Sequence, residues 1–160
     1  MMATVEQDVR IDRGSSSDID SVMIVMDSAF GRRFGEAWTR SQLAGILPMG
    51  GVSLMLAREP NDGEPVGFSL FRTVADESEL LLLGVLASHR RQGVGRRLLD
   101  NFLEQARNDG VARVHLEVRD GNPAVEMYRN VGFSPVGRRR NYYHAADEKR
   151  FDAITLAFQL

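Results

Sequence analysis

The sequence predicts an α/β protein in which about four helices flank one mixed β-sheet of about seven strands. The run from Leu80 to Leu86 is almost wholly apolar and too short for a membrane span, which is typical of a central strand covered on both faces. A helix with one apolar stripe follows this run, and residues 112–119 then alternate between polar and apolar. This order favours two parallel strands joined by a right-handed crossover.

A glycine-containing turn joins the central strand to this helix. Gly93 and Gly95 allow a tight turn and leave backbone N–H groups open at the start of a helix that ends near Asn108. Such groups and the helix dipole favour an anion. Four arginines flank the turn, at Arg90, Arg91, Arg96 and Arg97. The turn therefore indicates a phosphate-rich ligand, although a tight helix start with solvated arginines would give the same local pattern.

Capping and turn signals predict the elements of the first half. A strand is expected over Val5–Ile11, and a capped helix begins near Ile19. Thr39 and Gln42 form a capping-box pattern ahead of a second helix that ends near Pro48. The other strands are expected at Val52–Ala57, Val66–Val74, Val136–Tyr143 and Ile154–Leu160.

A polar break follows the alternating strand. Asn122 is expected to cap a fourth helix, with Pro123 at its first position and Gly132 at its end. Upstream, the aromatic residues Phe30, Phe34 and Trp38 have a spacing that favours the core, although they could instead line an acceptor pocket.

The composition excludes several classes of function. With 160 residues and 43% hydrophobic content, the chain is expected to fold as one domain over residues 1–160. The absence of cysteine removes disulfides and an acyl-cysteine intermediate, and no cluster has metal-ligand spacing. The net charge of −2 argues against direct nucleic-acid binding. Without a signal peptide or a run of about 18 apolar residues, the expectation is a cytoplasmic protein with no membrane partner.

The pattern Arg90-x-x-Gly93-x-Gly95 after a buried strand resembles the pyrophosphate-binding motif of the GCN5-related N-acetyltransferases (GNAT). The Walker pattern and the dinucleotide fingerprint both fail, because no Gly-Lys-Ser or Gly-Lys-Thr occurs and Leu98 stands at the third glycine. The resemblance implies that this loop binds the pyrophosphate of acetyl-coenzyme A (acetyl-CoA) as cosubstrate, with no metal. The loop residues concerned are Arg90, Arg91, Gln92, Gly93, Val94, Gly95 and Arg96.

The GNAT resemblance implies further contacts with the coenzyme. The backbone at Leu83, Gly84 and Val85 matches the strand end that orients the acetyl carbonyl and the pantetheine arm in the family. Asn122 matches a residue that contacts the coenzyme, although its role as a helix cap would explain it without a ligand.

The second half of the chain is similar to the bacterial RimI type of GNAT enzyme. The segments that carry this similarity are Leu116–Arg119, Asn122, Met127–Phe133 and Arg139–Tyr143. Enzymes of this type acetylate the N-terminal alanine of small-subunit ribosomal protein eighteen, so the resemblance implies a ribosomal protein N-terminus as acceptor. Residues 31–35 depart from the short Phe-Pro-Trp segment usual in that type, in a region that shapes the acceptor site.

Two side chains match the catalytic base and acid of this chemistry. An attacking amine must be neutral, and an α-amine with a pKa of about 7.7 to 8.0 needs only a modest base. The resemblance implies that Glu117 accepts this proton through water, although pairing with Arg113 or Arg119 would give it a structural role. Tyr128 matches the tyrosine that protonates the departing thiolate, with core packing as its alternative. His115 is expected to be structural.

The sequence thus predicts direct acetyl transfer from acetyl-CoA to a protein N-terminal α-amine within a ternary complex. A GNAT enzyme that acts on a lysine or a small-molecule amine is one alternative, and the mixed charge of residues 145–150 does not separate the two. A non-catalytic CoA-binding regulatory module is another. The presence of both Glu117 and Tyr128 argues against that module, and no oligomeric state is predicted.

Overall fold

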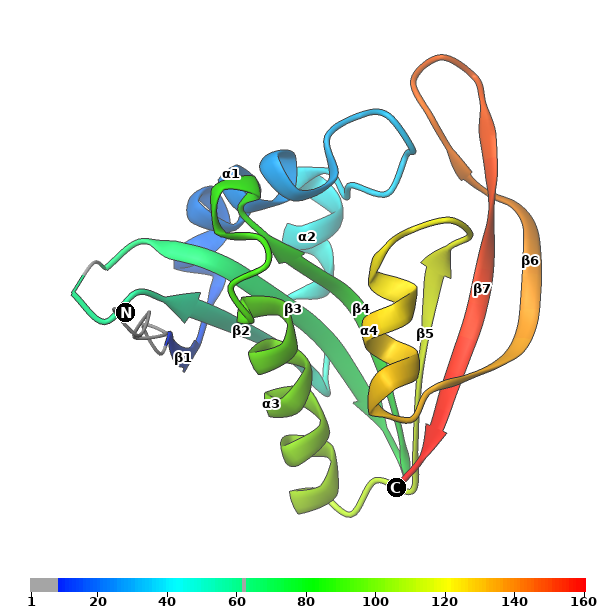
Figure 1. The fold of residues 1–160 in the computed structure, drawn as a ribbon. Helices are drawn as coiled ribbons and strands as arrows, with labels where there is room; N and C mark the ends of the chain where they lie inside the picture. Colours follow the sequence, from blue (N-terminus) through cyan, green and yellow to red (C-terminus); the bar gives the residue numbers. More distant parts are fainter. Residues whose placement is uncertain (1–8, 62) are drawn as a thin grey trace, which may run out of the picture.

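The computed structural model describes residues 9–61 and 63–160 and shows a seven-stranded mixed sheet with helices on both faces (Figure 1). The strand order is β1-β2-β3-β4-β5-β7-β6. The strands are β1 (Arg10–Arg13), β2 (Val52–Arg58), β3 (Pro65–Val74), β4 (Glu77–Val85), β5 (Arg113–Arg119), β6 (Ser134–His144) and β7 (Arg150–Gln159). The helices are α1 (Ile19–Phe30), α2 (Arg40–Ile46), α3 (Val94–Asn108) and α4 (Ala124–Val131), with 3-10 turns η1 (Ser16–Asp18) and η2 (Ala87–His89). The predicted α/β fold is confirmed.

The capping signals occur where the sequence predicts them. Ser15 and Asp18 form a capping box at η1, which leads directly into α1. Thr39 and the residue three positions later form the predicted capping box of α2. Of the strand expected over Val5–Ile11, residues 5–8 lie outside the described residues, and β1 begins at Arg10.

Each face of the sheet has its own hydrophobic core. On one face, α1 and α2 bury Val22, Val25, Met26 and Leu43 against β2, β3 and β4. On the other face, α3 packs on β2, β3 and β4, and the same core continues with α4 over β5 and β7. The stripe predicted on α3 is buried throughout, at Val94, Leu98, Leu99, Phe102, Leu103 and Ala106. Burying each large apolar side chain contributes about 1.5 to 3 kcal/mol, so these stripes hold the helices on the sheet.

β4 and β5 separate toward their carboxyl ends. The predicted parallel pairing joins Glu77–Leu80 to Arg113–Leu116. β4 then continues to Val85 and β5 to Arg119, and within the described chain no pairing joins these last residues. A bulge in β4 also leaves Leu81 without a partner on β3. The centre of the sheet is therefore open at one end.

This opening explains the burial pattern of the central strand. Leu80 and Leu82 are buried, whereas Leu81, Leu83 and Val85 are partly exposed. The expectation of a strand covered on both faces is confirmed, since α1 and α3 pack on its two faces, but burial is incomplete in its carboxyl half. These apolar side chains face the opening because β5 has moved away from them.

The hairpin of β6 and β7 completes the far side of the sheet. β6 is the edge strand, and all of its residues except Tyr143 are exposed. The hairpin reaches the same end of the molecule as the segment between α1 and α2 (Figure 1). None of the described helices is long and apolar enough to cross a membrane.

Candidate active site

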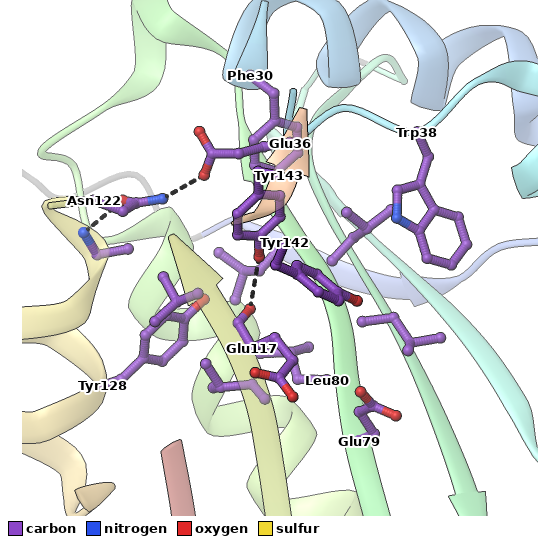
Figure 2. A pocket seen from close by; sticks show the side chains of 16 residues that line it. Phe30, Glu36, Trp38, Glu79, Leu80, Glu117, Asn122, Tyr128, Tyr142 and Tyr143 are labelled. Atoms are coloured by element: carbon purple, nitrogen blue, oxygen red, sulfur yellow. Dashed lines mark hydrogen bonds between the residues drawn. The ribbon is translucent and has the colours of Figure 1, made fainter. Parts of the chain in front are cut away.

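Two cavities meet at the opening between β4 and β5. A groove of about 770 Å³ lies along the carboxyl end of β4 and the starts of α3 and α4. A smaller acidic cavity of about 120 Å³ lies between the ends of β4 and β5 and the tyrosines of β6 (Figure 2). The residues that line both are Phe30, Glu36, Leu83, Asn122 and Ala124. A ligand in the groove can therefore reach a second ligand in the acidic cavity.

The groove brings together nearly all the residues predicted to bind the coenzyme. They line it from β4, from the start of α3 and from the loop before α4: Leu83, Gly84, Val85, Arg90, Arg91, Gly93, Val94, Gly95, Arg96 and Asn122. Gln92 does not line the groove. Segments that are far apart in the chain thus meet on one surface.

The start of α3 has the geometry of an anion site. Gly93 caps the helix in the left-handed region, with φ of +79°. The first backbone hydrogen bond of the helix runs from the N–H of Arg97 to the carbonyl of Gly93, at 3.0 Å, so the preceding N–H groups are open. A Cβ on Gly95 would lie 3.6 to 3.7 Å from three side chains of the groove. Open amides beside a groove kept wide by glycine fit the pyrophosphate and pantetheine of acetyl-CoA.

The arginines around this turn have separate contacts. Arg90 Nη2 donates to the carbonyl of Ala29 at 2.8 Å, which ties the turn to the end of α1. Arg96 Nε pairs with Asp100 one helical turn later, at 3.0 Å. Both arginines also line the groove, so they add positive charge where the helix dipole already favours an anion.

The acidic cavity has the opposite character. Its ionisable lining consists of three carboxylates and three phenols: Glu36, Glu79, Glu117, Tyr128, Tyr142 and Tyr143. None of its described lining residues is basic. Carboxylates favour a cation nearby, so the acidic cavity suits an ammonium group.

Glu117 is fixed by two neighbouring strands. Its Oε1 accepts a hydrogen bond from Arg139 Nε at 2.9 Å, and its Oε2 accepts one from the hydroxyl of Thr155 at 2.6 Å. The side chain is 11% exposed. Tyr143 Oη donates to the backbone carbonyl of Glu117 at 3.3 Å (Figure 2). The carboxylate is therefore held in one orientation at the wall of the acidic cavity.

The alternative pairing of Glu117 with an arginine of its own strand is wrong. Arg113 lies 3.7 Å from Glu77 instead, and Arg119 pairs with Glu36 at 3.2 Å. The partner of Glu117 is Arg139, which lies on β6. Because β7 lies between β5 and β6, the side chain of Arg139 reaches Glu117 across β7.

Tyr128 belongs to the hydrophobic core and also lines the acidic cavity. Its ring is buried, and it packs edge-to-face on Phe133 with the ring centres 5.9 Å apart. Burial, and secondarily the charge of Glu36, raises the pKa of its hydroxyl above the ordinary tyrosine value. The same two causes raise the pKa of Tyr143. Both phenols therefore keep their protons at neutral pH.

His115 lies beside the acidic cavity but does not line it. Its Nε2 is 3.7 Å from Oε2 of Glu79, its neighbour across the β4–β5 pair. Glu79 lines the acidic cavity and was not singled out from the sequence. An isolated glutamate on a strand carries no local signal; only the pairing of β4 with β5 places it near Glu117.

The aromatic residues before α2 have two roles. Phe30 and Trp38 pack against the core of α1 and α2 and also line the acidic cavity. Phe34 contacts Arg119 and Phe151, and it lines the groove. Phe30 and Trp38 are thus part of the core, as the spacing favours, and at the same time part of the wall of the acidic cavity.

Comparison with known proteins identifies the family. Residues 25–133 match the acetyltransferase (GNAT) family. The chain belongs to the GNAT family. Like the relatives it matches, this GNAT chain is an N-acetyltransferase that takes its acetyl group from acetyl-CoA. In the described part of the chain, no group of His, Asp or Glu residues could hold a metal ion.

Individual GNAT relatives agree in sequence and fold. The chain is 36% identical over 100 residues to the [ribosomal protein bS18]-alanine N-acetyltransferase of Escherichia coli, covering 62% of this chain and 67% of that protein. It is 44% identical over 99 residues to the N-alpha-acetyltransferase RimI of Mycobacterium tuberculosis, covering 59% of each. The crystal structure of the E. coli ribosomal-protein-S18-alanine N-acetyltransferase superposes with a TM-score of 0.84 at 28% identity, covering 94% of this chain and 93% of the other.

Proposed function

We propose that this enzyme acetylates the N-terminal α-amine of a protein, and that its acceptor is the N-terminal alanine of a small-subunit ribosomal protein. The observation that carries the proposal is the acidic cavity of about 120 Å³ that opens onto the groove. Glu36 and Glu117 pair with Arg119 and Arg139, whereas Glu79 has no arginine partner among the described residues, so its charge would attract an α-ammonium group. The small volume favours a first residue with a small side chain.

The relatives support this choice of acceptor. The E. coli protein that is 36% identical bears the name of an alanine N-acetyltransferase for ribosomal protein bS18. A ribosomal protein acceptor also implies action in the cytoplasm. We extend the proposal to one acetyltransferase domain over residues 1–160, which the continuous sheet from β1 to β7 supports.

The groove is proposed to hold acetyl-CoA along its whole length. The open N–H groups at the start of α3, with Arg90, Arg91 and Arg96 around them, would bind the pyrophosphate. The backbone of Leu83, Gly84 and Val85 pairs with β3 on one side and has no partner on β5 in the described chain. This open side would bind the pantetheine arm and orient the acetyl carbonyl toward the acidic cavity. The amide of Asn122 is already bonded to Glu36 and Ala124, which favours a structural role for it beside the coenzyme.

Glu117 and Tyr128 are proposed to move the protons. Acetyl-CoA supplies a thioester carbonyl as the acetyl donor. Glu117 takes a proton from the α-ammonium group, directly or through one water, and the neutral amine then forms the new C–N bond as the C–S bond breaks. Tyr128 gives its hydroxyl proton to the departing sulfur and regains one that the amide nitrogen loses. The transfer is proposed to be direct, and an acetyl-cysteine intermediate is excluded because the chain contains no cysteine.

Two peptides test the proposal. One is the N-terminal segment of the small-subunit ribosomal protein with a free amine, and the other is the same segment with a blocked N-terminus and an added lysine. After incubation with acetyl-CoA, intact-mass analysis should show one acetyl group on the free-amine peptide and none on the blocked one. Acetylation of the blocked peptide alone would contradict the proposal.

A further inference from the structure

Arg119 fastens the segment before α2 to the end of β5. Its side chain is 9% exposed, and its Nε donates to Oε1 of Glu36 at 3.2 Å. Its guanidinium carbon lies 3.5 Å from the centre of the Phe34 ring. Its Nη1 donates to the backbone carbonyl of Asp120 at 3.2 Å. The guanidinium is thus held by an ion pair, a ring face and the backbone at once.

Glu36 continues this chain of contacts to α4. Its Oε2 accepts a hydrogen bond from Asn122 Nδ2 at 2.9 Å (Figure 2). Asn122 Oδ1 in turn accepts the N–H of Ala124, the first residue of α4, at 2.9 Å. Tyr128 lies one turn further along that helix. Both oxygens of Glu36 are therefore engaged, one toward β5 and one toward the helix that carries Tyr128.

Residues 34–36, which we call the roof segment, also contact the hairpin of β6 and β7. The ring of Phe34 packs edge-on against Phe151 with the ring centres 5.1 Å apart. Gly35 has φ of +72°, and any Cβ there would collide with the carbonyl of His144. Glu36 lines both the groove and the acidic cavity, so the roof segment lies above the point where they meet.

We propose that Glu36 is a positioning residue for acetyl transfer, which acts through Arg119 and Asn122 to hold Tyr128 at the wall of the acidic cavity. The inference rests on the proposed role of Tyr128 as the acid. A buried ion pair is a weak source of stability, because desolvation offsets the attraction between its charges. The Glu36–Arg119 ion pair lies between the roof segment and α4, which points instead to a role in orienting α4.

A double-mutant cycle on kcat tests this inference, with both substrates saturating. Glu36→Gln is expected to lower kcat about 10- to 100-fold while changing the KM for acetyl-CoA less than about threefold. Tyr128→Phe is expected to lower kcat about 100-fold or more. The double variant should be no slower than Tyr128→Phe by more than about threefold, because Glu36 acts through that hydroxyl.

Glu126→Gln is the matched control. Glu126 is an exposed carboxylate on α4, so the variant removes the same charge from the same helix without touching the roof segment. The kcat of Glu126→Gln should stay within about twofold of wild type. When it is combined with Tyr128→Phe, the kcat of the double variant should stay within about twofold of that of Tyr128→Phe alone. A general effect of negative charge on Tyr128 would instead appear in this control as well.

The outcomes separate the inference from the proposed function. If the two single losses multiply in the double variant, or if Glu36→Gln keeps kcat within about twofold of wild type, the inference is overturned. If Tyr128→Phe leaves kcat unchanged, the acid role in the proposed function fails, and this inference fails with it. A multiplicative cycle with a strongly impaired Tyr128→Phe overturns the inference alone.

A second variant covers the case in which Glu36→Gln does not fold. That change leaves Arg119 buried without its partner, whereas Glu36→Gln combined with Arg119→Met removes both charges. Thermal unfolding should confirm that this combination is folded, and its kcat should fall by the same factor of about 10 to 100. A folded combination with wild-type kcat would overturn the inference.

Discussion

The hydroxyl of Thr155 donates a hydrogen bond of 2.6 Å to Oε2 of Glu117. The two residues are direct partners in the antiparallel pairing of β5 and β7, so the register of the sheet sets this contact. Arg139 reaches the other oxygen from β6, across β7. The carboxylate proposed to accept the proton of the amine is therefore oriented by the two strands on its outer side.

Glu117→Gln should lower kcat about 100- to 1000-fold, because the amide cannot accept the proton. Thr155→Val, which keeps the side-chain shape and removes the hydroxyl, should lower kcat about three- to tenfold through misorientation alone. Steady-state release of free coenzyme with the free-amine peptide measures both. Glu77→Gln, on β4 and outside the acidic cavity, is the control. Full activity in Glu117→Gln would refute the assignment of the base.

Gly95→Ala should weaken acetyl-CoA binding while the protein becomes no less stable. The new methyl group would make ordinary contacts of 3.6 to 3.7 Å with Leu83, Met127 and Val85, all of which line the groove. Alanine stabilises a helix relative to glycine by about 0.5 to 1 kcal/mol. We therefore expect an acetyl-CoA KM raised about tenfold, together with an unchanged or higher melting temperature.

Gly45→Ala is the control for that variant. Gly45 lies in α2 with no atom within 4 Å of a Cβ built on it, so this change gains helix propensity away from the groove. Its melting temperature should rise while the KM for acetyl-CoA stays at the wild-type value. Equal KM values for Gly95→Ala and Gly45→Ala would show that the groove does not hold the pantetheine arm at Gly95.

Glu79→Gln should raise the KM for the peptide acceptor about fivefold near pH 7. Glu79 lines the acidic cavity, where its charge would attract the α-ammonium group. The effect should shrink near pH 9, where an α-amine with a pKa of about 8 is mostly neutral. Initial rates against peptide concentration at both pH values provide the test, with Glu77→Gln again as control. An effect of the same size at both pH values would mean that Glu79 does not bind the cation.

The stability of the protein should fall as the pH rises above about 10. Burial raises the pKa of Tyr128 above its ordinary value, so the folded state keeps a proton that the unfolded chain loses above about pH 10. This stability is complete below that pH and declines above it, by up to about 1.4 kcal/mol per pH unit for one fully buried group. Urea unfolding should show that the free energy of unfolding falls less between about pH 8 and pH 10.5 for Tyr128→Phe than for wild type. An equal decline in the two proteins would contradict the claim that the buried hydroxyl of Tyr128 causes this loss of stability.

Local patterns in the sequence were sufficient for much of the fold. The central strand, the turn at Gly93, the stripe on α3 and the cap at Thr39 each depend on residues within one turn or one strand of each other. The fourth helix begins one residue later than predicted, at Ala124, with Pro123 before it and Asn122 accepting the N–H of Ala124. The separation of β4 from β5 has no such signal. It explains why Leu83 and Val85 line a groove although their sequence pattern is that of a fully buried strand.

The contacts that orient the candidate site could not be predicted from neighbouring residues. Arg119 and Glu36 are 83 positions apart, and Arg139 and Glu117 are 22 positions apart. Each pair depends on the order of strands at the far edge of the sheet or on the path of the roof segment. Residues 31–35 depart from the RimI type in sequence, and the contact of Phe34 with Arg119 is visible only in three dimensions.

One peptide that carries both a free N-terminal alanine and an internal lysine tests the central claim most directly. After reaction with acetyl-CoA near pH 7, tandem mass spectrometry locates the acetyl group on one nitrogen or the other. The account predicts acetylation of the α-amine with the lysine unmodified, and product that forms about 100- to 1000-fold more slowly when Glu117→Gln replaces the wild-type enzyme. Acetylation of the lysine, with a free α-amine, would contradict it.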